Sequence, residues 1–253
     1  MAVAKKKKQH QKPESAAATL EEIESLGDRL AEWIGHNPLP ILGTGAAVLA
    51  LAAGVGLFYN QRISALEASS VALAKVRLDY RDAMGASPNA FAIPEPASAK
   101  LAREVREEYV GRFEAVAEEH SGGSTASLAL LEAGGLQQQL GEQEKAIVLW
   151  QAALSHISGE TALRGIVLER IAGAQEHLGD FAAAAQSHAE AAELPSYPLR
   201  YNALVNAARC LAEAGDIEAA VAAFDRVERE SPGLNIAPHT EARLRELRAA
   251  QSL

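Results

Sequence analysis

Apolar residues follow two different patterns along this chain. Residues 39–59 form an apolar run of Leu, Ala, Gly, Val and Ile with few interruptions, and no charged residue occurs between Glu32 and Arg62. From residue 99 onward, apolar residues instead recur at helical spacing in segments separated by short polar or Gly/Pro turns. The first pattern predicts one membrane-spanning helix, and the second predicts a helical domain.

The length of the apolar run fits a bilayer. At about 1.5 Å per residue, a helix over 39–59 would reach roughly 31 Å, close to the ~30 Å hydrocarbon core. Two alternatives stay open: a buried helix of a soluble protein, and a cleaved signal peptide whose cleavage site would be Ala50-Leu51-Ala52. A phosphate-binding loop at 43–45 is excluded because no Lys-Ser or Lys-Thr pair follows.

Small residues fall on one face of this predicted membrane helix. Ala46, Ala50 and Gly54 are four residues apart, so they could let a second helix approach closely. Small residues are also common in membrane helices generally, and both interpretations remain open.

The charge pattern predicts the orientation. The lysines at 5–8 and Lys12 should stay in the cytoplasm, which places the C-terminal domain in the periplasm. Residues 1–17 lack periodicity and are predicted to be a disordered basic tail. The lysines could instead bind nucleic acid or anionic lipid, but a solvated tail needs no partner. The net charge of −9 argues against a nucleic-acid partner for the bulk of the chain.

The segments on either side of the apolar run are also predicted to be helical. Residues 18–38 form an acidic amphipathic helix on the cytoplasmic side, which would lie on the membrane or on a protein partner. Residues 60–98 continue as a helix and then a Pro-rich linker that contains Pro88, Pro94 and Pro96. The apolar side of the amphipathic helix consists of Leu20, Ile23, Leu26, Leu30, Trp33 and Ile34.

Three similar turns divide the C-terminal region. They are Gly141-Glu142, Gly179-Asp180 and Gly215-Asp216, which lie 38 and 36 residues apart. Each follows a helix with small residues, and a bulky side chain recurs in the helix after it at Trp150 and Phe224, with His188 at that place in the middle copy. Helices joined by so tight a turn pack closely only where side chains are small, so antiparallel helix pairs are expected to stack on one another.

This pattern resembles the tetratricopeptide repeat (TPR) over roughly residues 99–232. The predicted fold is therefore all-α, with one transmembrane helix followed by a TPR-like α-solenoid of antiparallel helix pairs over 99–253. A generic bundle of α-hairpins is the alternative.

The whole layout is similar to a narrower family. A helix containing Ala68-Ser69-Ser70 follows the apolar run, and the stretches 113–120 and 126–133 read FEAVAEEH and ASLALLEA. This resembles the ancillary SecYEG translocon subunits, which are bacterial inner-membrane proteins with a periplasmic TPR-like domain. The resemblance implies translocon subunits, periplasmic chaperones or unfolded clients as partners. The lysine run and the proline-rich loop 88–96 depart from the family pattern.

The sequence contains no arrangement that is typical of catalysis. The seven histidines include no pair at metal-ligand spacing on one helix, and a single cysteine excludes a disulfide framework and a cysteine-based zinc or iron–sulfur site. Cys210 stands among apolar residues and is predicted to be buried, with a reactive thiol as the alternative. We therefore expect no enzyme activity, no metal and no cofactor.

Binding is the remaining route to a function. In TPR arrays the first helices of successive pairs line a groove for a peptide or a partner helix. Its candidate residues here form a mixed, mildly acidic surface without the Lys/Asn set that would hold a C-terminal carboxylate. They are Leu131, Gly135, Gln138, Glu169, Glu176, His177, Asn202, Val205, Arg209 and Glu213.

Together these features predict a membrane-anchored protein–protein interaction module on the periplasmic side of the inner membrane. It would assist protein translocation or periplasmic chaperone networks. The alternative is a structural scaffold of a cell-envelope assembly or division complex.

Overall fold

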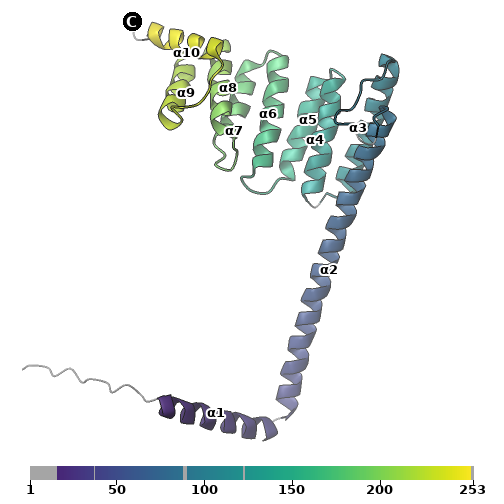
Figure 1. The fold of residues 1–253 in the computed structure, drawn as a ribbon, viewed down its shortest axis with the longest axis vertical. Coiled ribbons are helices and arrows are strands. Elements are labelled where there is room, and N and C mark those ends of the chain that lie inside the picture. Colours follow the sequence, from purple (N-terminus) through teal and green to yellow (C-terminus); the bar gives the residue numbers. More distant parts are fainter. Residues whose placement is uncertain (1–15, 37, 88–89, 122, 252–253) are drawn as a thin grey trace, which may run out of the picture. The chain divides into compact units, whose positions relative to one another are not determined.

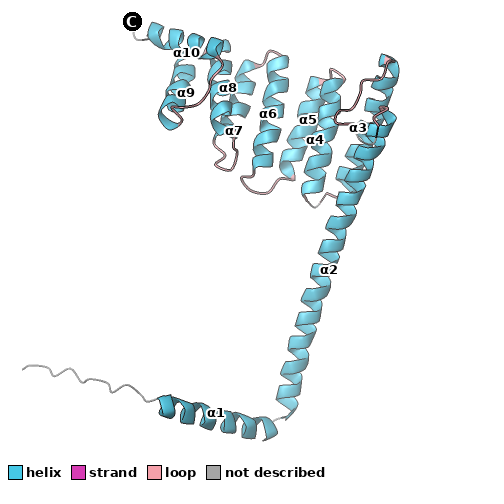
Figure 2. Ribbon diagram, viewed as in Figure 1, coloured by secondary structure: helices cyan, strands magenta, loops and turns pink. Residues whose placement is uncertain are grey.

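A computed structural model describes residues 16–36, 38–87, 90–121 and 123–251. All of its regular secondary structure over these residues is helical (Figure 2), which confirms the all-α prediction for this part of the chain. The predicted tail 1–17 lies almost entirely outside the described residues. The helices are α1 (Ala16–His36), α2 (Pro38–Ala83), α3 (Ala99–Glu119), α4 (Ser124–Gln139), α5 (Gln143–Ser155), α6 (Ala162–His177), α7 (Phe181–Ala192), α8 (Arg200–Glu213), α9 (Ile217–Glu230) and α10 (Pro238–Gln251).

The chain divides into two compact units, Met1–Ser64 and Ala65–Leu253. The first holds α1 and the beginning of α2, and every described side chain from residue 43 to residue 64 in it is exposed. One helix among the described residues, Gly43–Ala83, is long and apolar enough to cross a membrane, judged by length and composition. None of its most apolar stretch is buried.

The second unit is a row of helices in which each packs mainly on its neighbours in sequence (Figure 1). It begins inside α2, because Leu73, Tyr80 and Met84 are buried in one core with side chains of α3, α4 and α5. The Tyr80 and Tyr109 rings lie 5.3 Å apart, and the Ser69 and Thr125 hydroxyls are hydrogen-bonded at 2.9 Å. The end of α2 therefore belongs to the repeat body.

The three Gly-acid turns have a common backbone structure. Gly141, Gly179 and Gly215 have φ values of 84°, 78° and 88°, a left-handed conformation that glycine adopts without strain. After each glycine, the acidic residue's N–H bonds back to the carbonyl five residues earlier, as Asp180 does to Gln175 at 2.9 Å. This arrangement caps the preceding helix in the Schellman manner. The same turn therefore joins α4 to α5, α6 to α7 and α8 to α9.

Two of the three turns also cap the following helix with a side chain. The Asp180 carboxylate accepts a hydrogen bond from the Ala183 N–H, and that of Asp216 accepts one from the Ala219 N–H, each at 3.1 Å. The longer Glu142 makes no such bond at the start of α5. An acidic N-cap satisfies a backbone donor that the helix itself cannot pair.

Small residues bring the helices of a pair together, as the sequence predicts. The indole of Trp150 lies on Gly134, where a Cβ atom would come within 2.3 Å of Nε1. The indole N–H also donates to the Leu131 carbonyl at 3.1 Å. Between α6 and the α7–α8 loop, Gly165 leaves the same kind of room for the ring of Tyr197.

The far end of the unit is covered by α10, which packs on α9 and α8. Leu244 is buried there with Phe224 of α9. The Arg248 guanidinium lies 5.4 Å from the Phe224 ring centre and pairs with Asp225 at 3.1 Å. The row of helix pairs therefore ends in a short, charged helix.

Candidate functional site

The middle repeat differs from its neighbours at two matched positions. His188 lies nine residues after Gly179, as Trp150 and Phe224 do after their own glycines. Ten residues before each glycine stand Leu131, Glu169 and Val205. The outer repeats therefore hold an apolar pair where the middle repeat holds a carboxylate and an imidazole.

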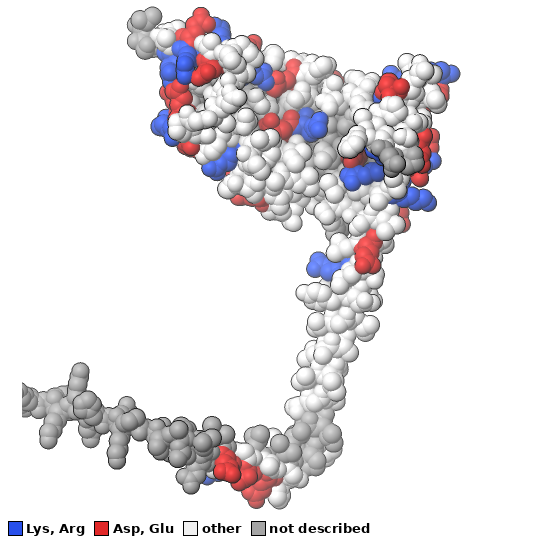
Figure 3. All heavy atoms as spheres, in the orientation of Figure 1, with Lys and Arg blue, Asp and Glu red and all other residues white. Residues whose placement is uncertain are grey.

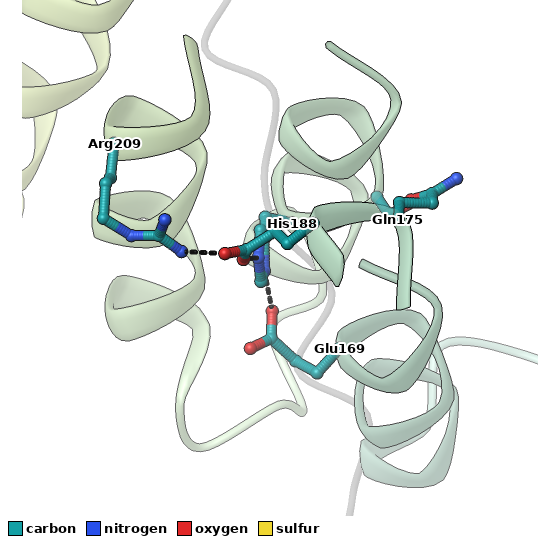
Figure 4. A network of polar contacts seen from close by, with 6 residues as sticks. Glu169, Gln175, His188 and Arg209 are labelled. Carbon is teal, nitrogen blue, oxygen red and sulfur yellow. Dashed lines mark hydrogen bonds and ion pairs between the residues drawn. The ribbon is translucent and has the colours of Figure 1, made fainter. Parts of the chain in front are cut away.

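The imidazole of His188 is buried between two carboxylates. Only 3% of its side chain is exposed. Its Nδ1 lies 2.6 Å from Glu169 Oε1, and its Nε2 lies 2.8 Å from Glu176 Oε1 (Figure 4). Glu169 and Glu176 are seven residues apart in α6 and so lie on one face of that helix. Both carboxylates contact His188 of α7. Because a carboxylate only accepts, this arrangement is satisfied when both ring nitrogens carry protons.

The electrostatics agree with that geometry. Burial by itself lowers the pKa of His188, but the hydrogen bonds with Cys210, Glu169 and Glu176 outweigh it and raise the pKa to about 10. Burial raises the pKa of Glu176, and the hydrogen bonds from Arg209 and His188 more than offset this, so its net pKa is lowered. The site therefore holds an imidazolium beside the ionised Glu176 carboxylate at neutral pH.

Further polar groups connect this site to neighbouring helices. Arg209 of α8 donates to Glu176 Oε2 at 2.6 Å (Figure 4). On the other side, the Ser187 hydroxyl donates to Gln175 Oε1 at 2.7 Å. The charged network thus joins α6, α7 and α8, which belong to two successive helix pairs.

The only cysteine of the chain, Cys210, completes the cluster from α8. It is fully buried, as the sequence predicted. Glu176, His188 and Cys210 each offer one possible ligand atom, and these atoms all lie within 4.8 Å of one another. They are the residues of the described part of the chain that could hold a metal ion. The single cysteine excludes zinc sites built from several cysteines, but a mixed set of one cysteine, one histidine and one carboxylate falls outside that exclusion.

The structure brings together three of the ten predicted groove residues, Glu169, Glu176 and Arg209, but uses them to surround His188. Val205 is buried at 7% exposure, while Leu131 and Gln138 are partly buried. The residues with exposed side chains are His177, Asn202 and Glu213.

Gly135, the remaining groove candidate, lines a separate pocket of about 370 Å³ at the start of the repeat body. Its walls carry three arginines and two glutamates over an apolar floor. Arg77 pairs with Glu132 at 2.7 Å, and Arg106 pairs with Glu95 and donates to Gln139. The charges in this pocket are therefore largely neutralised by one another.

The predicted helix-packing face, Ala46, Ala50 and Gly54, is exposed along α2. A Cβ on Gly54 would meet no atom within 4 Å. Packing of this face against a second helix stays a prediction.

Sequence reasoning missed His188 as the centre of a site. The sequence shows that His188 occupies the place of the bulky Trp150 and Phe224 of the other repeats. The second comparison, in which Glu169 occupies the place of Leu131 and Val205, was not made from the sequence. That comparison was the available signal. The approach of Cys210, which lies 22 residues after His188, depends on how α8 packs against α7 and has no local signature.

No protein-family model matches the chain, and comparison with curated protein sequences finds no significant match. Among solved structures, the chain is similar to the first TPR domain of Spaghetti (RPAP3) bound to the HSP90 peptide SRMEEVD. That likeness has 19% sequence identity and a TM-score of 0.40, and it covers 52% of this chain and 99% of the other. A likeness of this size says nothing about function, so the TPR-like description rests on the turns and helix packing described above.

Proposed function

We propose that the chain is a membrane-anchored protein–protein interaction module. The part of α2 that comprises residues 39–59 would span the bacterial inner membrane. The repeat body would lie in the periplasm and bind other proteins. Translocon subunits, periplasmic chaperones or unfolded clients are the proposed partners, on the resemblance to ancillary SecYEG subunits.

The exposed apolar part of α2 is the observation that carries this proposal. Large apolar side chains there are well exposed, among them Leu49 at 71% and Leu51 at 70%. Charged side chains are absent from this stretch of the helix (Figure 3). Contiguous exposed apolar surface of this kind is characteristic of a surface that meets lipid or another protein, and a helix can satisfy its own backbone groups in lipid.

The residues beside the apolar stretch support its orientation. Trp33 precedes it and Phe58 and Tyr59 end it, and aromatic residues favour the two membrane interfaces. The lysines at 5–8 favour a cytoplasmic N-terminus, although their structure lies outside the described residues. The repeat body would then follow on the periplasmic side.

Protein binding is proposed for the repeat body because its helices are held by neighbour-to-neighbour packing, which leaves an extended surface along the row. The exposed side chains His177, Asn202 and Glu213 lie near the ends or outer faces of α6 and α8. They offer a mixed polar surface suited to a polypeptide rather than to a nucleic acid.

Protease accessibility tests the orientation. The full chain with an epitope after Leu253 is produced in a bacterium with two membranes, and the outer membrane is permeabilised. We expect added protease to remove the epitope while a cytoplasmic marker stays intact. An epitope that is digested only after the inner membrane is lysed contradicts the proposal.

Capture of partners tests the interaction separately. The chain is isolated from membranes in mild detergent, and translocon subunits are expected to copurify. H177A, N202A and E213A combined should reduce this capture without moving the chain from the membrane. If neither the parent chain nor the triple variant captures translocon subunits while both stay in the membrane, the translocon is excluded as the partner. The proposal of a membrane anchor would still stand.

A structural scaffold of an envelope complex is the second candidate, favoured by the exposed small-residue face of α2. Cross-linking in membranes would then give dimers or larger species for the parent chain. G54L adds bulk to this face and should abolish these species. A parent chain that gives only monomers would contradict this candidate function.

A further inference from the structure

We propose that Glu176, His188 and Cys210 form a binding site for a divalent transition-metal ion of the Zn²⁺ class, at the joint between the second and third helix pairs. This site is independent of the proposed function. It joins α6, α7 and α8, which each supply one ligand.

The geometry is close to that of a metal site. Bond lengths of about 2.3 Å for Zn–S and about 2.0–2.2 Å for Zn–N and Zn–O require ligand atoms roughly 3.3–3.6 Å apart in a tetrahedron. Nε2 of His188 and Oε1 of Glu176 are 2.8 Å apart, and all three ligand atoms lie within 4.8 Å of one another. The spacing that an ion requires lies within the range of these separations, so small side-chain adjustments would seat the ion, and a water would complete four ligands.

The groups around the ligands are those that support a metal-bound histidine. Glu169 accepts a hydrogen bond from Nδ1 at 2.6 Å, which leaves Nε2 to face the other two ligands. A carboxylate on the second ring nitrogen fixes the tautomer and the ring orientation of a ligating histidine. Arg209 holds Glu176 by its other oxygen, Oε2, and so leaves Oε1 for the ion.

The donor set selects the kind of ion. Thiolate and imidazole favour Zn²⁺ and Co²⁺ over Mg²⁺ and Ca²⁺, which prefer sets of oxygen ligands. The burial of Cys210 and His188, with 0% and 3% exposed, separates this cluster from the acidic residues of the solvated surface. The partly exposed Glu176 is the side from which an ion can enter.

Cobalt binding tests the site directly. The full chain, purified in detergent and stripped with a chelator, is titrated with Co²⁺. We expect one ion per chain, a sulfur-to-cobalt charge-transfer band, and displacement of the band by Zn²⁺. Mg²⁺ should not compete.

Matched variants separate this site from surface binding. C210A should abolish the band, and its fold should persist because Ala174 occupies the equivalent buried place in α6. E169Q should weaken binding by about 10–100-fold. H239A, which removes an exposed histidine in α10, should leave Co²⁺ binding unchanged. Equal binding by C210A and the parent chain, or no saturable binding by the parent chain, would overturn the proposal.

Discussion

The indole of Trp150 rests on Gly134, and this contact fixes how closely α4 and α5 approach. Nothing larger than hydrogen fits on the glycine, because a Cβ would come within 2.3 Å of the ring nitrogen. Trp150 is fully buried, so its ring has little room to move away. Protein interiors are packed densely enough for such an overlap to be felt throughout the pair.

The substitution G134A should therefore destabilise the repeat body by about 1–3 kcal/mol, the usual cost of forcing extra volume into a packed core. Urea unfolding followed by circular dichroism and by tryptophan fluorescence measures this loss. G135A is the control, because no atom lies within 4 Å of a Cβ at the next position. That variant should be neutral or stabilising by up to about 1 kcal/mol, since alanine is the better helix former. Equal effects of the two variants would contradict the packing described.

The charged pair of the middle repeat gives a second prediction. H188F restores the aromatic residue of the outer repeats but leaves Glu169 partly buried without its partner. We expect a loss of about 1–3 kcal/mol, as for an unpaired buried polar group. The free energy of unfolding in urea measures it.

The double variant E169L/H188F should recover most of this loss, because it recreates the apolar pair found at Leu131 and Trp150. Replacement of a buried ion pair by packed apolar residues is often neutral or stabilising. Glu176 keeps Arg209 as its partner in this variant. A double variant less stable than H188F would contradict the matching of the repeats.

The stability of the metal-free protein should depend on pH through His188. Its pKa is raised from 6.5 to about 10 on folding. The folded state therefore binds the proton more tightly, and the stabilisation is complete below pH 6.5 and is lost as the pH rises toward 10. Unfolding in chelator at pH 6 and pH 9 should show a larger loss for the parent chain than for E169L/H188F. Equal losses of unfolding free energy in the two proteins would show that His188 does not cause the pH dependence.

The turns between helix pairs make a fourth prediction. G179A and G215A place a side chain in the left-handed conformation and should each cost about 1–2 kcal/mol. D180A and D216A remove an N-cap and should each cost about 1 kcal/mol. Thermal unfolding of the four variants measures these changes. E142A is the control for the aspartates, because Glu142 makes no capping bond, and an E142A loss equal to theirs would contradict the capping role.

The sequence predicts the helices and turns well because these depend on local rules. A glycine followed by an acid ends one helix and begins the next, and helical periodicity defines the rest. The packing of Trp150 on a small residue also follows from the spacing of the repeats. These features need no knowledge of distant contacts.

The site could not be predicted in the same way. His188, Glu169 and Cys210 come together because α7 lies against both α6 and α8, and that depends on the stacking of one pair on the next. The predicted groove comes from the first helices alone and therefore includes Glu176 and Arg209, although each of them is paired with another side chain. Only the spatial arrangement shows which polar groups are already occupied.

Extraction of membranes with alkaline carbonate tests the central claim, that the apolar part of α2 anchors the chain in a bilayer. The parent chain should remain in the membrane pellet. L49D/L51D should move to the supernatant, because each charge at the centre of a span costs about 2.5–3.5 kcal/mol. L78D, which changes an exposed residue of α2 within the repeat body, should stay in the pellet. A parent chain that is released as freely as L49D/L51D would contradict the account.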